Sequence, residues 1–551
     1  MSRKSIVCCF VFFLFLSIAG FLGFANGCGG GTRETMTPPP PPPPPAAVGI
    51  ILTQRNDNAR TGQNLIETTL TPTNVTSVSF GKLFSYPVDG AIYGQPLYVQ
   101  DLTIGAQGVR NVVYVATQHD SVYAFDADQK SPGTLWTVNF TNSANSVTTV
   151  PCADEPQTCQ FMGTEIGISS TPVIDLSTKT LFVCAFTKES GAYIHRLHAL
   201  DLTTGAEKFG GPVVVQATAP GNGGGSSGGN LAFNAFKHLQ RAALLLVNGV
   251  VYLTFASYDD SPPYHGWVLG YDSQTLASVS ALNLTANGGY GGIWQSGVGP
   301  AADASGNVYV ITGNGTFDAN TGGANFGDSF VKLQPSGNSL AVADYFTPNN
   351  QAMLSTSDDD LGSGGPLLLP EQTSSHPHLI LSGGKQGTLY LVDRDNMGHF
   401  KAADNSQIVQ SLVGVVKPIF SGPAYWENKV YIAGVKDTIK QFSLDTGLLS
   451  TAPVSQSTAT FGFPGAELAV SANGSANGIL WALENAAYRI QAPAVLHAYD
   501  ANDVSHELYN STQAGTRDTL GFGVGFSVPS VANGKVYVGT LSELDVFGLI
   551  Q

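Results

Sequence analysis

The chain repeats one short pattern eight times, and this repeat constrains the fold more than any other feature. Each copy is a run rich in Val, Tyr, Ile and Phe, a short turn, and a second such run that ends near Asp. The first copy, residues 113–126, is VYVATQHDSVYAFD. Such runs, bounded by Gly, Asn and Asp, are typical of β-strands. The copies begin at Val113, Leu181, Val251, Val308, Leu379, Val430, Leu480 and Val536.

Further short strands flank most copies. TPVIDLS, GPAADAS and VPSVANG each precede a copy, and LWTVNF follows the first one. Four-stranded antiparallel units that recur about every 60 residues indicate a β-propeller. We therefore predict an all-β fold, an eight-bladed propeller that fills residues 49–551.

A propeller must also close its ring. The eighth copy ends at Gln551, directly after LDVFGL, and leaves no residues for its outer strand. The segment KLFSYPV, residues 82–88, precedes the first copy and has the character of an outer strand. We predict that this N-terminal strand completes the last blade, because closure removes the open edges that invite aggregation.

Composition agrees with this fold and excludes other classes of protein. The chain of 551 residues has 64 Gly and 31 Pro, which suits a protein rich in turns. Aromatic residues make up 10%, which argues against a disordered chain. The formal net charge of −15 argues against nucleic-acid binding, because little would neutralise the phosphates.

The N-terminal residues 1–27 have the pattern of an export signal. Arg3 and Lys4 precede an apolar run over residues 6–25, as in secretory signals, and the run is also long enough to remain as a membrane anchor. Cys28 follows the small residues Ala25 and Gly27, as a lipidated cysteine would, although plain cleavage nearby explains the pattern equally well. We predict a protein of the periplasm or cell surface, either released or anchored to the membrane.

Residues 28–48 form a linker rich in Gly and Pro. Eight consecutive prolines occupy residues 38–45. Polyproline is stiff and extended, so we expect a semi-rigid spacer between the N-terminus and the propeller.

The cysteines also suit an exported protein. Cys152 and Cys159 bracket the short segment CADEPQTC, and in an oxidising compartment we expect them to form a disulfide. Cys184 lies in the apolar run LFVCAF, so we expect a buried free thiol.

Four segments resemble those of the quinoprotein dehydrogenases, which are eight-bladed propellers that use pyrroloquinoline quinone (PQQ) with a calcium or lanthanide ion. GTEIGISSTP contains Glu165, and GGYGGIWQSGVGPAADASGNVYVITGNG contains Trp294 and Asn314. DDDLGSGGP begins with residues 358–360, and GGKQGTLYLVDRDNMG contains Lys385. The segments occur in the family's order, on successive blades.

The resemblance implies a role for each of these residues. It places metal ligands at Glu165, Asn314, Asp359 and Asp360, and cofactor contacts at Trp294, Lys385 and Gln95. Carboxylate and amide oxygens suit a hard cation, and a Trp face suits a flat quinone.

The catalytic residues that the resemblance implies are Asp359 and Lys385. An aspartate would take the hydroxyl proton of an alcohol while hydride passes to the quinone, and Lys385 would stabilise the reduced cofactor. Matching back from Pro366 selects Asp359. Alternation along a strand would instead put Asp358 and Asp360 on one face.

Departures from the family leave a second function open. The family's adjacent disulfide is missing, since the adjacent cysteines of this chain are Cys8 and Cys9 in the N-terminal apolar run. FSGPAYW also lacks the expected Asn-Trp pair. One hypothesis is an exported PQQ- and metal-dependent dehydrogenase, with an alcohol or sugar and an electron acceptor as partners. The alternative is a non-catalytic propeller, a binding or assembly scaffold of the cell envelope. Glycan binding is a third hypothesis.

Overall fold

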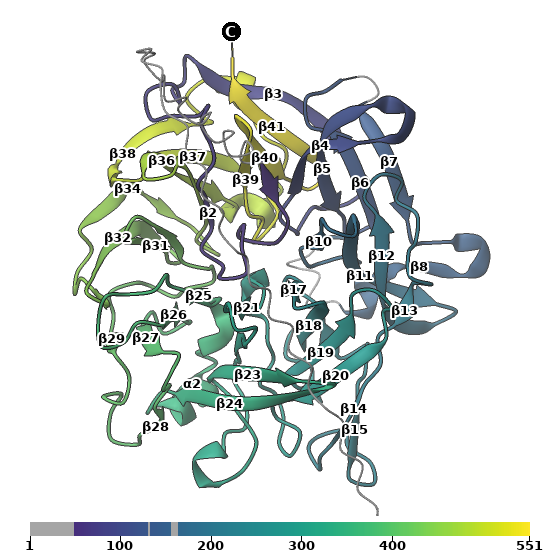
Figure 1. Ribbon diagram of the computed structural model, residues 1–551, viewed down its shortest axis with the longest axis vertical. Coiled ribbons are helices and arrows are strands. Elements are labelled where there is room, and N and C mark those ends of the chain that lie inside the picture. The colour runs from purple at the N-terminus through teal and green to yellow at the C-terminus, as the bar shows by residue number, and fades with distance from the viewer. Residues whose placement is uncertain (1–48, 131–132, 156–162, 551) are drawn as a thin grey trace, which may run out of the picture. The chain divides into compact units, whose positions relative to one another are not determined.

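The computed structural model describes residues 49–130, 133–155 and 163–550, and these fold into eight blades (Figure 1). Most blades consist of four antiparallel strands, with the Val- and Tyr-rich runs as their middle strands. The predicted all-β, eight-bladed propeller is therefore confirmed. The predicted signal, the linker and Cys28 lie outside the described residues.

The first four blades follow one another along the chain. Within each of them, chain order leads from the inner strand to the outer strand. Blade 1 is β4 (Leu97–Thr103), β5 (Val109–Ala116), β6 (Ser121–Asp126) and β7 (Thr134–Asn139); blade 2 is β10 (Val173–Asp175), β11 (Thr180–Glu189), β12 (Ala192–Asp201) and β13 (Val213–Val214); blade 3 is β17 (Leu245–Val247), β18 (Val250–Ser257), β19 (Trp267–Asp272) and β20 (Ser278–Asn283); blade 4 is β21 (Ala301–Ala302), β22 (Val308–Ile311), β23 (Phe330–Ser336) and β24 (Ser339–Thr347).

The next four blades complete the propeller, and the last takes its outer strand from the N-terminal part of the chain. Blade 5 is β25 (Leu367–Leu368), β26 (Leu379–Gly383), β27 (Leu389–Asp393) and β29 (Gln410–Leu412); blade 6 is β30 (Ala424–Trp426), β31 (Lys429–Ala433), β32 (Asp437–Asp445), β33 (Leu448–Leu449) and β34 (Ser455–Phe461); blade 7 is β35 (Ala466–Asn473), β36 (Ala476–Glu484), β37 (Val495–Asp500) and β38 (Asp503–Asn510); blade 8 is β39 (Ser530–Ala532), β40 (Lys535–Gly539), β41 (Glu543–Leu549) and β3 (Phe80–Pro87).

Short elements between the blades build the loops. The strands β8 (Val147–Pro151) and β9 (Glu165–Ile166) extend blade 2, β16 (His238–Leu239) pairs with β18, and β28 (His399–Phe400) pairs with β24. The strands β14 (Thr218–Pro220) and β15 (Asn230–Ala232) form a separate hairpin. The helix α2 (Gln351–Ser357) connects blades 4 and 5.

The hydrophobic core lies between neighbouring blades, because each blade is covered on both faces. Tyr252 and Val268 of blade 3 pack with Val310 and Val331 of blade 4, and all four side chains are buried. Burial of a large apolar side chain contributes about 1.5–3 kcal/mol. The stabilising contacts are thus distributed from blade to blade.

The last blade closes as predicted. Strand β3 pairs antiparallel with β41, from Phe80 opposite Leu549 to Pro87 opposite Glu543, and the two strands lie side by side in Figure 1. Lys82 forms an ion pair with Asp545 across this seam, at 2.6 Å. The N-terminal strand of the sequence prediction therefore completes blade 8.

A second closing device was not predicted from the sequence. Residues 49–67, which we call the inner clasp, hydrogen-bond to the first strand region of every blade. Two short strands pair with inner strands, β1 (Ile50–Ile51) with β4 of blade 1 and β2 (Gln63–Asn64) with β35 of blade 7. In blades 2, 4, 5 and 6, clasp carbonyls accept hydrogen bonds from backbone N–H groups: Leu52 from Ile174, Asn58 from Ala302, Ala59 from Leu368, and Thr61 from Tyr425. In blades 3 and 8, side-chain amides of the clasp donate to backbone carbonyls: Asn58 to Leu246 and Asn64 to Val531.

Two buried arginines of the clasp bind carbonyl groups of the blades. Arg55 donates to the carbonyls of Pro423 and Leu468, and Arg60 donates to that of Pro300 at 2.9 Å. Burial lowers the pKa of Arg55 to about 10 and that of Arg60 to about 9, so both stay charged at neutral pH. The clasp thus pairs polar groups that would otherwise be buried without partners.

One of the two cysteine predictions is confirmed, and the other is not tested. Cys184 is a buried free thiol, as expected. Cys152 is disulfide-bonded, but its predicted partner Cys159 lies outside the described residues, so the pairing stays a prediction. Within the described ranges, none of the helices is both long and apolar enough to cross a membrane.

The clasp predicts where the chain can be truncated. Deletion of residues 1–46 should leave a folded protein, whereas deletion of residues 1–67 should unfold it. The longer deletion orphans buried backbone groups in all eight blades, and each such group costs about 1–3 kcal/mol. Thermal unfolding and size-exclusion chromatography would compare the two proteins. A stable, monodisperse chain that begins at Thr68 would refute this role of the clasp.

Candidate functional site

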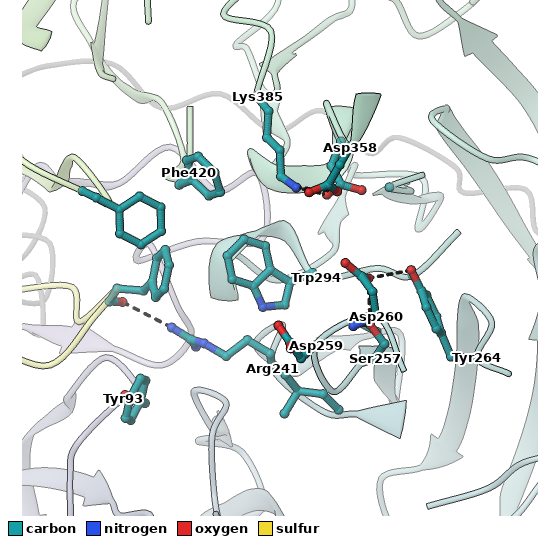
Figure 2. A pocket seen from close by; sticks show the side chains of 18 of the residues that line it. Tyr93, Arg241, Ser257, Asp259, Asp260, Tyr264, Trp294, Asp358, Lys385 and Phe420 are labelled. Atoms are coloured by element: carbon teal, nitrogen blue, oxygen red, sulfur yellow. Dashed lines mark hydrogen bonds and ion pairs between the residues drawn. The ribbon is translucent and has the colours of Figure 1, made fainter. Parts of the chain in front are cut away.

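A cavity of about 390 Å³ brings together residues from distant parts of the chain (Figure 2). Its lining combines three chemical groups. The aromatic residues are Tyr93, Tyr264, Trp294, Phe420, Phe463 and Phe526; the cations are Arg241, Lys385 and Arg489; the carboxylates are Asp259, Asp260, Asp358 and Asp360.

The aromatic wall is centred on Trp294, which is half-buried. Its ring meets Phe526 at 5.1 Å and Phe420 at 6.2 Å between centroids, both nearly at right angles. Edge-to-face packing of this kind is favourable and holds the rings rigidly. A preformed aromatic wall suits a flat ligand.

Lys385 joins two aspartates at one side of the cavity. Its Nζ lies 2.8 Å from Asp358 Oδ1 and 2.6 Å from Asp360 Oδ2. Asn314 ties the same two residues together, since its backbone N–H donates to Asp360 Oδ1 and its Nδ2 donates to Asp358 Oδ1. Gly313 makes this possible, because a Cβ there would lie 2.5 Å from Asp360 Oδ1.

Burial and charge shift the pKa values in this cluster. Burial raises the pKa of Asp360, although attraction to Lys385 and its hydrogen bonds oppose the shift. Burial lowers the pKa of Lys385, but attraction to Asp360 and the bonds to both aspartates outweigh it, so the net shift is upward. Burial, and then the charge of Asp360, raise the pKa of nearby Asp328 to about 8. Asp328 is therefore mainly protonated at neutral pH.

The structure puts Asp358 and Asp360, rather than Asp359, at the cavity. The reason is local. The preceding residues form α2 rather than a strand, Asp358 ends that helix with a left-handed φ of 58°, and the Asp359 N–H bonds back to Leu354 O at 2.9 Å. Strand alternation also paired Asp358 with Asp360, but here a helix end rather than a strand places both residues at the cavity.

Glu165 and Gln95 do not line the cavity. Glu165, on β9, lies 2.9 Å from His119 Nδ1 and accepts a hydrogen bond from Thr149 Oγ1 at 2.7 Å. Gln95 is buried and accepts a hydrogen bond from the Arg55 backbone N–H of the clasp at 2.7 Å. The structure gives these two residues other partners than the implied metal and quinone.

The implied metal-ligand set does not assemble. Asn314 Oδ1 is buried without a hydrogen-bond partner and could serve a cation. However, Glu165 is held elsewhere, and the ammonium of Lys385 already bridges Asp358 and Asp360. Across residues 49–130, 133–155 and 163–550, no group of three or more His, Cys, Asp and Glu is placed to hold a metal.

Arg241 was missed in the sequence. Its side chain is buried, and its guanidinium donates to the carbonyls of Ser169 and Phe526, at 3.0 and 3.5 Å. The same group lies over the rings of Tyr93 and Phe526. A signal was present, since Arg241 directly precedes the apolar run AALLLV.

Comparison with known proteins supports the fold. No family model matches the chain, and no curated protein matches its sequence. The solved structures that resemble it include a quinohemoprotein alcohol dehydrogenase from Pseudomonas putida HK5, with a TM-score of 0.58, 12% identity, and coverage of 91% of this chain and 80% of that one. A europium-containing methanol dehydrogenase matches with a TM-score of 0.56 and 14% identity, covering 91% and 98% of the two chains. At these identities the likeness shows a shared propeller fold.

Asp328 predicts a pH dependence of stability. Its pKa is about 8 when folded and near the ordinary value when unfolded, so its contribution to stability falls as the pH rises from about 4 to about 8, by at most about 1.4 kcal/mol per unit. Asp328→Asn, which mimics the protonated acid, should therefore gain stability relative to the unmutated protein at pH 9 more than at pH 5. Denaturant unfolding at both pH values measures this, with Asp359→Asn as the control. An equal change in the free energy of unfolding at the two pH values would contradict the prediction.

Proposed function

We propose that this protein is an exported, PQQ-dependent dehydrogenase that oxidises an alcohol or sugar, and that the cavity beside Trp294 binds the quinone. The observation that carries the proposal is the convergence of Trp294, Lys385, Asp358 and Asp360 on one cavity. Both solved structures named above are dehydrogenases, one an alcohol dehydrogenase and one a methanol dehydrogenase. The calcium or lanthanide ion is left out of the proposal, because its implied ligands do not assemble.

The cavity suits PQQ, which is flat and carries several negative charges. Trp294 and the phenylalanines around it offer aromatic surface for stacking. Lys385 and Arg241 offer positive charge. When bound, the quinone would accept hydride from the carbon of the alcohol, and an external electron acceptor would later reoxidise it.

Asp358 is the better candidate for the general base. Its side chain is 68% exposed, and within the described part of the chain only its Oδ1 receives hydrogen bonds. Both oxygens of Asp360 are occupied, one by the Asn314 N–H and the other by Lys385. We therefore assign Asp358 to accept the hydroxyl proton of the substrate and Asp360 to position Lys385.

Lys385 has two tasks in this scheme. It supplies positive charge at its end of the cavity, which stabilises the negative charge that develops as the cofactor is reduced. It also keeps Asp358 oriented through the 2.8 Å ion pair.

Export remains part of the proposal. Residues 1–27 would direct the chain to the periplasm or cell surface, and residues 28–48 would space the propeller from the N-terminus. The disulfide of Cys152 agrees with an oxidising compartment.

Variants of the cavity separate binding from catalysis. Trp294→Ala should weaken PQQ binding about tenfold, because it removes a stacking surface. Asp358→Asn should keep PQQ binding but lower turnover about 10²–10⁴-fold, as expected for loss of a general base. Asp359→Asn should change neither. Quenching of tryptophan fluorescence by PQQ measures binding, and dye reduction over a panel of alcohols and sugars measures turnover.

Two results would contradict this assignment. Full activity in Asp358→Asn with loss in Asp359→Asn would restore Asp359 as the base. If PQQ neither quenches the unmutated protein nor supports dye reduction, the dehydrogenase proposal fails and the scaffold hypothesis takes its place.

A further inference from the structure

Arg241 is a buried cation that makes no ion pair with the carboxylates of the described residues. Only 3% of the residue is exposed, and its guanidinium donates to the carbonyls of Ser169 and Phe526. Gly297 lets the chain pass close beside it, since a Cβ there would lie 2.3 Å from Nη1. A buried charge without a partner of opposite sign is costly. An anion in the cavity would therefore stabilise this arrangement.

The carboxyl group that acts on Arg241 does not supply that anion. Glu467 attracts Arg241 from a distance, but it is fully buried and also faces Arg55. Burial raises the pKa of Glu467 to about 8, so this carboxyl is mainly neutral at pH 7. The positive charge of Arg241 is thus left available to a ligand.

Lys385 provides the second positive charge of the cavity. In the view of Figure 2, Lys385 lies above Trp294 and Arg241 lies below it. A flat ligand against the aromatic wall would thus meet two cations, Lys385, which is paired with Asp358 and Asp360, and Arg241, which is not paired with a carboxylate of the described residues. This pattern suits a planar molecule that carries at least one carboxylate.

The ammonium of Lys385 also occupies the position between the two carboxylates that a cation would need. Asp358 and Asp360 both bind it within 2.8 Å. Of the other implied ligand carboxylates, Asp359 does not line the cavity and Glu165 accepts a hydrogen bond from Thr149. The ammonium therefore occupies the place of a cation between these two carboxylates, and Arg241 is left as the cavity's buried cation without a carboxylate partner in the described residues.

We propose that Arg241 and Lys385, rather than a metal ion, compensate the negative charge of the ligand in this cavity. The inference rests on the proposed function for the identity of that ligand, PQQ. It goes beyond the proposed function in assigning carboxylate binding to Arg241 and in making the site independent of calcium and lanthanide ions.

The first experiment titrates the purified full chain with PQQ and follows tryptophan fluorescence. One sample contains EDTA, and the others contain added calcium or lanthanum after removal of the chelator. We expect the same dissociation constant in all three, because the protein itself supplies the positive charge. Binding that appears only with an added ion would overturn the inference while leaving the proposed function intact.

The second experiment changes the cation. Arg241→Met should weaken PQQ binding about ten- to hundredfold, as expected for loss of a charge-assisted hydrogen bond. Arg196→Met is the matched control, because Arg196 pairs with Glu189 and does not line the cavity. Thermal unfolding of both variants without ligand checks that they fold. Unchanged PQQ affinity in a folded Arg241→Met protein would also overturn the inference.

A third experiment avoids mutation altogether, in case Arg241→Met does not fold. The unmutated protein, in EDTA, is titrated with 9,10-phenanthrenequinone, a planar quinone without carboxylates. PQQ should bind at least about tenfold more tightly, and more weakly as salt is added. Equal affinity for both quinones contradicts the role of the cations. Failure of PQQ to bind under every condition removes the proposed function itself, and the inference with it.

Discussion

Hydrogen bonds from the inner clasp to all eight blades are the constraint on which the rest of the structure depends. The inner strand of a propeller blade has no neighbouring strand on its axial side, so its polar groups need another partner. The clasp provides one to each blade in turn and adds two buried arginines where carbonyls converge. It also contacts the segment that carries Trp294, because Arg60 donates a hydrogen bond to the carbonyl of Pro300.

The distribution of charge gives the cavity its chemical character. The chain as a whole has a formal net charge of −15, and three cations and four carboxylates line this cavity. Lys385 is paired with Asp358 and Asp360, so Arg241 is the cation on which binding of an anionic ligand would chiefly depend. Charged groups in a partly desolvated cavity interact more strongly than on the surface. The position of one buried arginine can thus decide which ligands the cavity accepts.

The repeating strands and the closure by β3 could be predicted because local patterns of apolar residues and turn residues indicate them. The clasp could not, since most of it is irregular chain whose partners lie up to several hundred residues away. Matching the segment back from Pro366 to the family pattern selects Asp359. That match cannot show the short helix α2, which places Asp358 and Asp360 rather than Asp359 at the cavity. Glu165 shows the same limit, because His119 and Thr149, which hold its carboxylate, come from other strands and loops. Arg241 was predictable in principle, since an arginine directly before a buried apolar run must find polar partners.

The state of Asp328 bears on how Asp358 can work as a base. At neutral pH the raised pKa of Asp328 keeps it mainly protonated, so Asp358, Asp360 and Lys385 make a cluster of two negative charges and one positive charge. If Asp328 were ionised, a further negative charge would lie beside Asp360, and Lys385 would be drawn toward it. With Asp328 neutral, Lys385 stays between the two aspartates. Uptake of a proton by Asp358 then brings the cluster to neutrality, which is favourable in a site where burial disfavours net charge.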